Sequence, residues 1–153
     1  MSDLRDLYQD IILDHGRHPR NFRVSPDANH HAHGHNPLCG DKVTVYLHLE
    51  DDIVKDVSFE GKGCAISMAS ASLMTEVLKG KKLEDTKILF NAFHSVVTGG
   101  ASINVPDDLV DDYDRLDPLT GVKTYPARVK CATLAWHTFE AAVLGASANV
   151  KTE

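Results

Sequence analysis

The sequence predicts a single α+β domain over residues 1–153, in which a small antiparallel β-sheet packs against helices. One observation is a hairpin pattern: a strand from Asp41, the turn Glu50-Asp51-Asp52, and a partner strand through Val57. The other is helical periodicity on both sides of this hairpin, with no strand–helix–strand alternation. A chain of this length can bury roughly two thirds of its unfolded surface, which is enough for one core.

The first predicted helix covers residues 3–14, where apolar side chains recur at the spacing of one helical face. They are Leu4, Leu7, Tyr8, Ile11 and Ile12. Residues 15–36 are polar and contain two prolines and the sequence HHAHGH, so we predict a loop there.

The first strand of the hairpin alternates apolar and polar residues from Asp41 onward. Side chains two apart on a strand share a face, and the odd positions carry Val43, Val45, Leu47 and Leu49. The same parity places Asp41, and by extension Cys39, on the side that faces the core. A carboxylate and a thiol are therefore expected together at the edge of an apolar face.

Three further helices are expected. One begins at Cys64 and stops near Gly80, and its many Ala and Ser residues would permit close backbone approach. Another covers roughly residues 82–97, and the last begins at Pro126, a favourable first-turn residue. The acidic, insertion-like segment of about residues 98–125 is either a functional surface loop or partly helical.

The charge balance excludes several function classes. The chain has 16 Lys and Arg against 22 Asp and Glu, a net charge of −6, which gives no general attraction for nucleic acid or anionic lipid. No apolar run approaches the ~18 residues of a membrane span, and the acidic N-terminus lacks the apolar core of a signal peptide. We therefore expect a cytoplasmic protein.

The three cysteines, with no CxxC spacing, argue against a disulfide framework. Such scattered cysteines are more often unrelated small hydrophobic residues than one site. Here each lies at the edge of an element: Cys39 before the first strand, Cys64 at a helix start, and Cys131 in the first two turns of the last helix. A helix N-terminus stabilises a thiolate, and Arg128 lies on the same side of its helix as Cys131.

Three thiolates and the carboxylate of Asp41 would make four ligands, the number a tetrahedral zinc site requires. Sulfur ligands favour soft or borderline metals over Mg²⁺ or Ca²⁺. Such a site would carry net negative charge, which Arg128 and Lys130 are candidates to offset. The spacing matches no zinc-finger pattern, and two simpler alternatives stay open: Asp41 as a turn cap after Gly40, and Arg128 as an ordinary solvated residue.

Three motifs resemble the cysteine motifs of the iron–sulfur assembly family that includes NifU N-terminal domains, IscU and SufU. They are NPLCGD, GKGCAIS and YPARVKCATLAW. The opening LYQDIILDHGRHPRNF is also similar to the first helix of that family, and the similarity runs from about Leu4 to Ala146. The resemblance implies a compact SufE/NifU-like α+β fold whose cysteines converge at one end.

The subtype resembles SufU. Lys130 stands where IscU proteins carry a histidine, YPARVK does not match their chaperone-recognition motif, and residues 98–125 correspond to an insertion found in SufU-type members. The resemblance implies zinc bound by Cys39, Asp41, Cys64 and Cys131.

It also implies a sulfurtransferase that accepts persulfide sulfur on Cys39 from a PLP-dependent, SufS-like cysteine desulfurase. In the family a histidine of the partner replaces Cys39 on the metal. Arg128 is the second residue we predict to be catalytic, and downstream iron–sulfur scaffold proteins are possible further partners.

Two other functions stay open: a scaffold that assembles and transfers a [2Fe–2S] cluster on the same ligands, and a purely structural zinc domain. The latter is less favoured because closed structural sites usually have Cys and His ligands only. The histidine cluster of residues 30–35 is expected to be a surface segment that binds metal adventitiously. We expect structural roles for His94 and His137, and no histidine is locally paired with a cysteine as in a Cys–His hydrolase.

Overall fold

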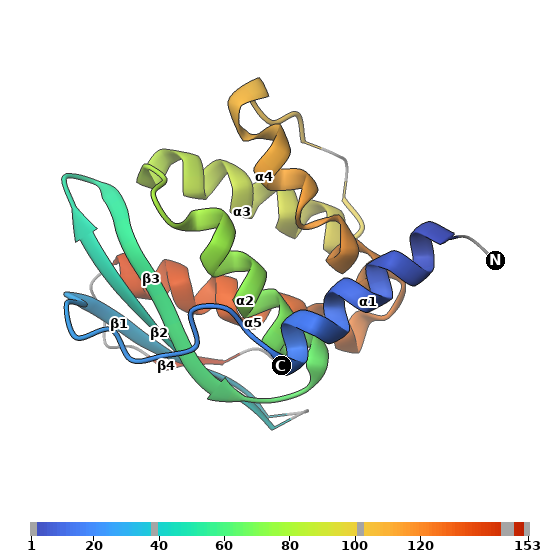
Figure 1. Cartoon of the computed structure of the whole chain (residues 1–153), viewed down its shortest axis with the longest axis horizontal. Helices are drawn as coiled ribbons and strands as arrows, with labels where there is room; N and C mark the ends of the chain where they lie inside the picture. The colour runs from blue at the N-terminus through green and yellow to red at the C-terminus, as the bar shows by residue number, and fades with distance from the viewer. Residues whose placement is uncertain (1–2, 38–39, 101–102, 145–148, 152–153) are drawn as a thin grey trace.

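The computed structural model describes residues 3–37, 40–100, 103–144 and 149–151. Figure 1 shows how its helices and strands are arranged in space. Within the described ranges no helix is both long and apolar enough to cross a membrane. The elements are α1 (Asp3–Arg17), β1 (His30–Asn36), β2 (Asp41–Glu50), β3 (Ile53–Lys62), α2 (Ala65–Leu78), α3 (Leu83–Val97), η1 (Asp107–Leu109), α4 (Val110–Asp114), η2 (Asp117–Thr124), α5 (Pro126–Val143) and β4 (Asn149–Lys151).

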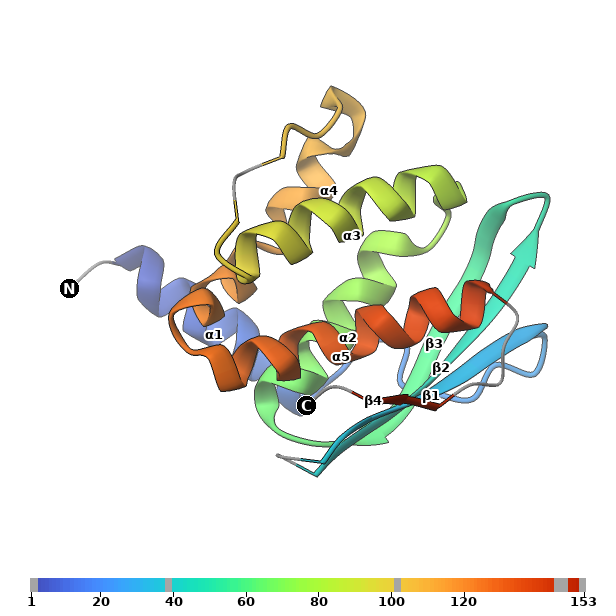
Figure 2. The same cartoon turned by 180° about the vertical axis from the view of Figure 1, so that it is seen from behind.

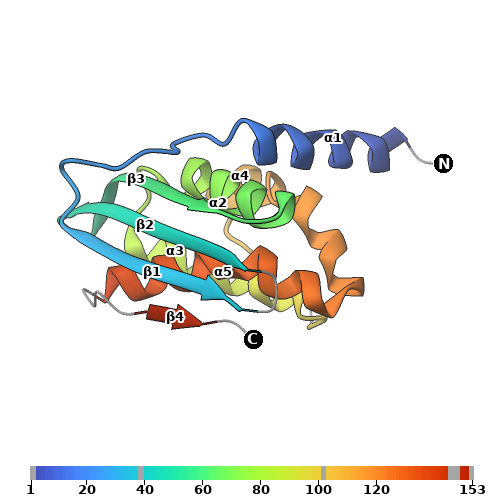
Figure 3. The ribbon, with the colours of Figure 1, turned by 90° about the horizontal axis from the view of Figure 1, so that it is seen from below.

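The strands form one sheet in the order β3-β2-β1-β4, seen side by side in Figure 3. β1, β2 and β3 pair antiparallel, which confirms the predicted α+β class, and the short β4 adds a parallel edge to β1. Helices α2, α3 and α5 lie on one side of the sheet in both Figure 1 and Figure 2. The fold therefore has one covered sheet face and one open face.

The β2–β3 hairpin confirms the predicted parity. Asp41, Val43, Val45 and Leu47 are buried and alternate with more exposed residues, whereas Leu49, after a register shift next to His48, is half-buried. The turn residues Asp51 and Asp52 have φ values of 54° and 60°, the left-handed pair that a two-residue hairpin turn requires.

The predicted loop over residues 15–36 is wrong at both ends, because residues 15–17 belong to α1 and His30–Asn36 form strand β1. On the side of β1 that faces the helices, Ala32, Gly34 and Asn36 are buried, and His30 is half-buried with Nδ1 2.9 Å from the carbonyl oxygen of Ala142 in α5. Ala32 and Gly34 are small because α5 runs close to the sheet: a Cβ atom on Gly34 would overlap Oγ1 of Thr138. Two of the three buried positions of β1 are therefore Ala and Gly, which give no apolar signal in the sequence.

Helix α2 is the central element of the helical layer. It contacts α1, α5 and β3, and only Ala65, Ile66 and Glu76 keep more than slight exposure. The close approach expected from its small residues is present, since a Cβ on Gly16 of α1 would lie 3.2 Å from the Cβ of Ala65. Ser70 joins α2 to α5: its hydroxyl accepts from Trp136 Nε1 at 3.1 Å and donates to a backbone carbonyl of α5 at 2.5 Å.

The segment between α3 and α5 is partly helical, which was one of the two structures expected for residues 98–125. It contains η1, α4 and η2, and η2 contacts α1, α3 and α5. Its apolar side chains are buried in the core despite the acidic sequence around them: Leu109, Leu116, Leu119 and Val122.

Candidate metal centre

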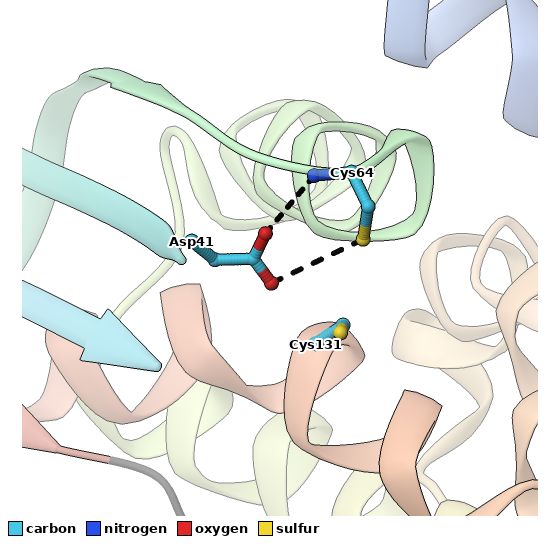
Figure 4. Close-up of side chains that lie close together, drawn as sticks. All are labelled: Asp41, Cys64 and Cys131. Atoms are coloured by element: carbon cyan, nitrogen blue, oxygen red, sulfur yellow. Dashed lines mark hydrogen bonds between the residues drawn. The ribbon is translucent and has the colours of Figure 1, made fainter. Parts of the chain in front are cut away.

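Three of the predicted ligands meet at one end of the domain. One ligand atom from each of Asp41, Cys64 and Cys131 can be chosen so that all lie within 4.8 Å of one another. Figure 4 shows the side chains turned toward one another from the start of β2, the start of α2 and the first turns of α5. The convergence comes from three element ends brought together by the packing of α2 and α5 on the sheet.

Asp41 is fully buried and bonded to a distant part of the chain. Its Oδ1 accepts a hydrogen bond from the backbone N–H of Cys64 at 3.0 Å, and its Oδ2 lies 3.9 Å from Cys64 Sγ. Gly63 leaves the room that the carboxylate occupies, because a Cβ there would overlap Oδ1. These contacts make Asp41 a tertiary link between β2 and α2, which a local turn cap would not be.

Cys64 is the N-cap residue of α2. Its Sγ accepts from the N–H of Ser67 at 3.4 Å, the position that a serine or aspartate oxygen occupies in an ordinary cap. The free N–H groups and the positive end of the helix favour negative charge on this sulfur. The fold thus places Cys64 Sγ at the N-terminal end of α2, next to Asp41.

Cys131 is fully buried, with Sγ near two polar groups. Nδ2 of Asn36 lies 3.9 Å from Sγ, and the carbonyl oxygen of Ala127 lies at 3.7 Å. An amide N–H directed at sulfur is the kind of outer contact that orients a metal ligand. Asn36 is a site residue that sequence reasoning missed; extending the parity of Ala32 and Gly34 along β1 would have found it.

Two residues were predicted to be catalytic, Cys39 and Arg128, and the structure describes only Arg128. Cys39 lies outside the described residues, so its place in the site stays a prediction. Arg128 is exposed on the first turn of α5, and in the described structure its side chain makes no hydrogen bond or ion pair. Lys130, the other candidate cation, is half-buried.

The donor set fits a divalent metal ion. In a tetrahedral zinc site, sulfur and oxygen ligands lie about 3.5 Å apart and two sulfurs about 3.8 Å apart. The 3.9 Å between Cys64 Sγ and Asp41 Oδ2 is close to that spacing. Among the described residues no Lys, Arg or His nitrogen lies within 4.0 Å of the Asp41 carboxylate, so a bound cation would neutralise a charge that is costly to bury alone.

No histidine joins this ligand cluster in the part of the chain that the structure describes. His94 and His137 pack edge-on against Phe90, with ring centroids 5.6 and 5.3 Å from it, as their predicted structural roles require. Burial, with a smaller contribution from His94, lowers the pKa of His137. His30, His31, His33 and His35 lie on β1 and not on a loop.

The sequence matches a known protein family and is similar to proteins of named function. Residues 7–132 match the family model described as the NifU-like N terminal domain. The chain is 42% identical over 142 residues to the zinc-dependent sulfurtransferase SufU of Bacillus subtilis (strain 168), covering 93% of this chain and 92% of that one. It is 36% identical over 137 residues to the iron–sulfur cluster assembly scaffold protein IscU of Thermotoga maritima, covering 90% and 92%.

Solved structures show the same likeness. A crystal structure described as a candidate iron–sulfur cluster assembly scaffold protein for the SUF system, from Fervidobacterium islandicum AW-1, superposes with a TM-score of 0.75 at 34% identity. The match covers 91% of this chain and 98% of that one. A NifU-like N-terminal protein from Brucella abortus gives a TM-score of 0.80 over 94% and 96% of the two chains; at 23% identity it shows the shared fold alone.

Proposed function

Because the chain belongs to the SufU-type branch of the NifU/IscU family of iron–sulfur cluster assembly proteins, we propose that it is a zinc-dependent sulfurtransferase. It accepts persulfide sulfur on Cys39 from a SufS-like, PLP-dependent cysteine desulfurase. The observation that carries the proposal is the meeting of Asp41, Cys64 and Cys131 around a space that suits one ion. Lys130, where the scaffold branch is expected to have a histidine, supports sulfur transfer over cluster assembly.

Asp41, Cys64 and Cys131 would hold the metal, with Cys39 as the fourth ligand. Bound zinc would keep the thiolates deprotonated and moderate the nucleophilicity of Cys39. The protein's own groups then fix the ligands: the Cys64 N–H holds Oδ1 of Asp41, and the Asn36 amide contacts Cys131 Sγ. These bonds orient the resident ligands while Cys39 exchanges sulfur.

In the transfer step, the Cys39 thiolate attacks the outer sulfur of the desulfurase persulfide. A new S–S bond forms on Cys39, the S–S bond of the donor breaks, and the donor cysteine leaves as a thiolate. Oxidation state is conserved overall, so no oxidant or reductant is consumed. The cytoplasm keeps protein thiols reduced, and we place this chemistry there, with iron–sulfur scaffold proteins as downstream acceptors.

Cys39→Ala tests the proposal directly. The variant should accept no sulfur from the desulfurase and cysteine, while circular dichroism shows an unchanged fold. Retained stimulation of the desulfurase by this variant would remove Cys39 from the mechanism.

Arg128→Ala tests the second residue. Arg128 is exposed near Cys131, where its charge can attract an anionic persulfide, so the transfer rate should fall. Lys123→Ala on η2 is the matched control, because Lys123 is also exposed. Equal rates for the two variants would make Arg128 an ordinary surface residue.

The scaffold function is the second candidate, favoured by the names of the T. maritima and F. islandicum relatives. Anaerobic purification without a histidine tag separates the two. A colourless protein that retains about one zinc per chain through dialysis fits the sulfurtransferase, whereas a brown protein with acid-labile sulfide fits the scaffold. Retained zinc with no sulfur accepted from the desulfurase would indicate a structural site, and loss of zinc in Asp41→Ala would support the carboxylate as a ligand.

A further inference from the structure

The open face of the sheet carries a pair of imidazoles on β1. His31 and His33 are both exposed and lie on the opposite side of the sheet from Ala32 and Gly34, which face α5. Their ring centroids are 5.7 Å apart and the rings are inclined by 74°. Helices α2, α3 and α5 all lie on the other side of the sheet, which leaves this face accessible (Figures 1 and 2).

The pair has the geometry to share one ion. Residues two apart on a strand have Cα atoms about 6.6 Å apart on the same face. Two imidazoles bound to one tetrahedral ion at 2.0–2.1 Å have ring centres about 5 Å apart. The observed 5.7 Å exceeds that distance by an amount that a small side-chain rotation removes.

Thr44 on the neighbouring strand holds one of the rings. Nδ1 of His33 lies 2.7 Å from Oγ1 of Thr44, its cross-strand partner in the β1–β2 register. In the tautomer that donates from Nδ1, Nε2 of His33 is the unprotonated nitrogen and can bind a metal. An outer hydrogen bond to the second ring nitrogen fixes the orientation and the tautomer of a histidine that binds a metal.

We propose that His31 and His33 form a second metal site, for a divalent transition-metal ion such as Zn²⁺, Ni²⁺ or Cu²⁺. Neutral imidazole is a good ligand for these borderline ions, and water completes the coordination. His35 shares the face but lies opposite Lys42, whose charge repels a cation at that end of the strand.

The site is separate from the cysteine centre. Asn36, not His33, is the cross-strand partner of Asp41, and Asp41 faces the helices while His33 faces away from them. Asn36 is three residues further along β1 than His33, which corresponds to about 10 Å along the strand. One ion therefore cannot bind both ligand sets, and the second site does not depend on the proposed sulfur transfer.

Titration of the tag-free, zinc-loaded protein with Ni²⁺ tests the proposal. Paramagnetic Ni²⁺ should broaden the imidazole resonances of His31 and His33 before those of other histidines. His31→Gln and His33→Gln should each weaken Ni²⁺ binding about tenfold or more, and Thr44→Val about tenfold, as measured by calorimetry. His18→Gln is the matched control, since His18 is exposed and has no neighbouring ring contact among the described residues.

Three results would overturn the second site. One is wild-type Ni²⁺ affinity in the His31 and His33 variants, and another is an equal loss of affinity in His18→Gln. The third is release of zinc in step with Ni²⁺ uptake, which would place the nickel on the thiolates. All of these variants change solvent-exposed or half-buried side chains, and their fold is checked by thermal unfolding in the presence of a chelator.

Discussion

Replacing Gly63 with alanine is expected to push the carboxylate of Asp41 out of the ligand cluster. A Cβ atom on residue 63 would overlap Oδ1 of Asp41 and lie 2.9 Å from its Cγ. To restore an ordinary contact of about 3.4 Å, the Cγ must retreat by about 0.5 Å. The φ of Gly63 lies outside the left-handed region, so the effect of alanine there is steric.

The displacement should be measurable in two quantities. It weakens the 3.0 Å bond between Asp41 Oδ1 and the N–H of Cys64, and loss of such a buried bond costs about 1–3 kcal/mol. Each kcal/mol lowers Tm by about 2–4 °C in a chain of this size. Because the second carboxylate oxygen moves as well, zinc affinity should fall about 10–100-fold, the range seen when the support of a ligand is removed.

The assay pairs thermal unfolding of the metal-free protein with chelator competition for zinc. Gly121→Ala is the control, because a Cβ at that position would meet nothing within 4 Å. It reports the effect of glycine replacement on the unfolded chain alone. If Gly63→Ala has the same Tm and the same zinc affinity as Gly121→Ala, the predicted displacement of Asp41 is refuted.

Three further outcomes are expected from the packing. Gly34→Ala should cost about 1–3 kcal/mol in urea unfolding, since the new methyl overlaps Oγ1 of Thr138, and adding Thr138→Ala should recover part of the loss. Ser70→Ala removes the acceptor 3.1 Å from Nε1 of buried Trp136 and should cost about 1–3 kcal/mol; an unchanged urea midpoint would contradict this. Burial lowers the pKa of His15 below its ordinary 6.5, so the unfolded chain binds the proton more readily and stability falls as pH drops through that value. His15→Gln should flatten this dependence between about pH 7.5 and 5.5, and equal slopes would count against it.

The hairpin could be predicted because its signal is local. From Asp41 to Leu47 the inward positions of β2 after the carboxylate are large and apolar, so the period of two is visible in the residue types. Strand β1 carries the same period, but its inward residues include Ala32 and Gly34 and its outward ones are histidines. Its pairing with β2 and its cover by α5 are tertiary effects, which a window of sequence does not contain.

The same contrast between local signals and tertiary effects explains which site residues could be predicted. Cys64 and Asp41 could be placed because each stands at a recognisable element boundary, and the family motifs supplied their common purpose. Asn36 escaped notice because its role depends on Cys131, 95 residues away. In residues 98–125 the acidic residues hid the leucines that enter the core, since burial there depends on α1, α3 and α5 and not on local periodicity.

The ligand residues stand far apart along the chain, and this has a consequence for biosynthesis. Asp41 and Cys64 emerge from the ribosome before Cys131, which lies in α5, and α5 follows both β2 and α2 in the chain. Metal affinity in such a site is gained together with folding. A nascent chain that ends before α5 therefore lacks Cys131, and under the proposed function it would capture its ion only after α5 has been made.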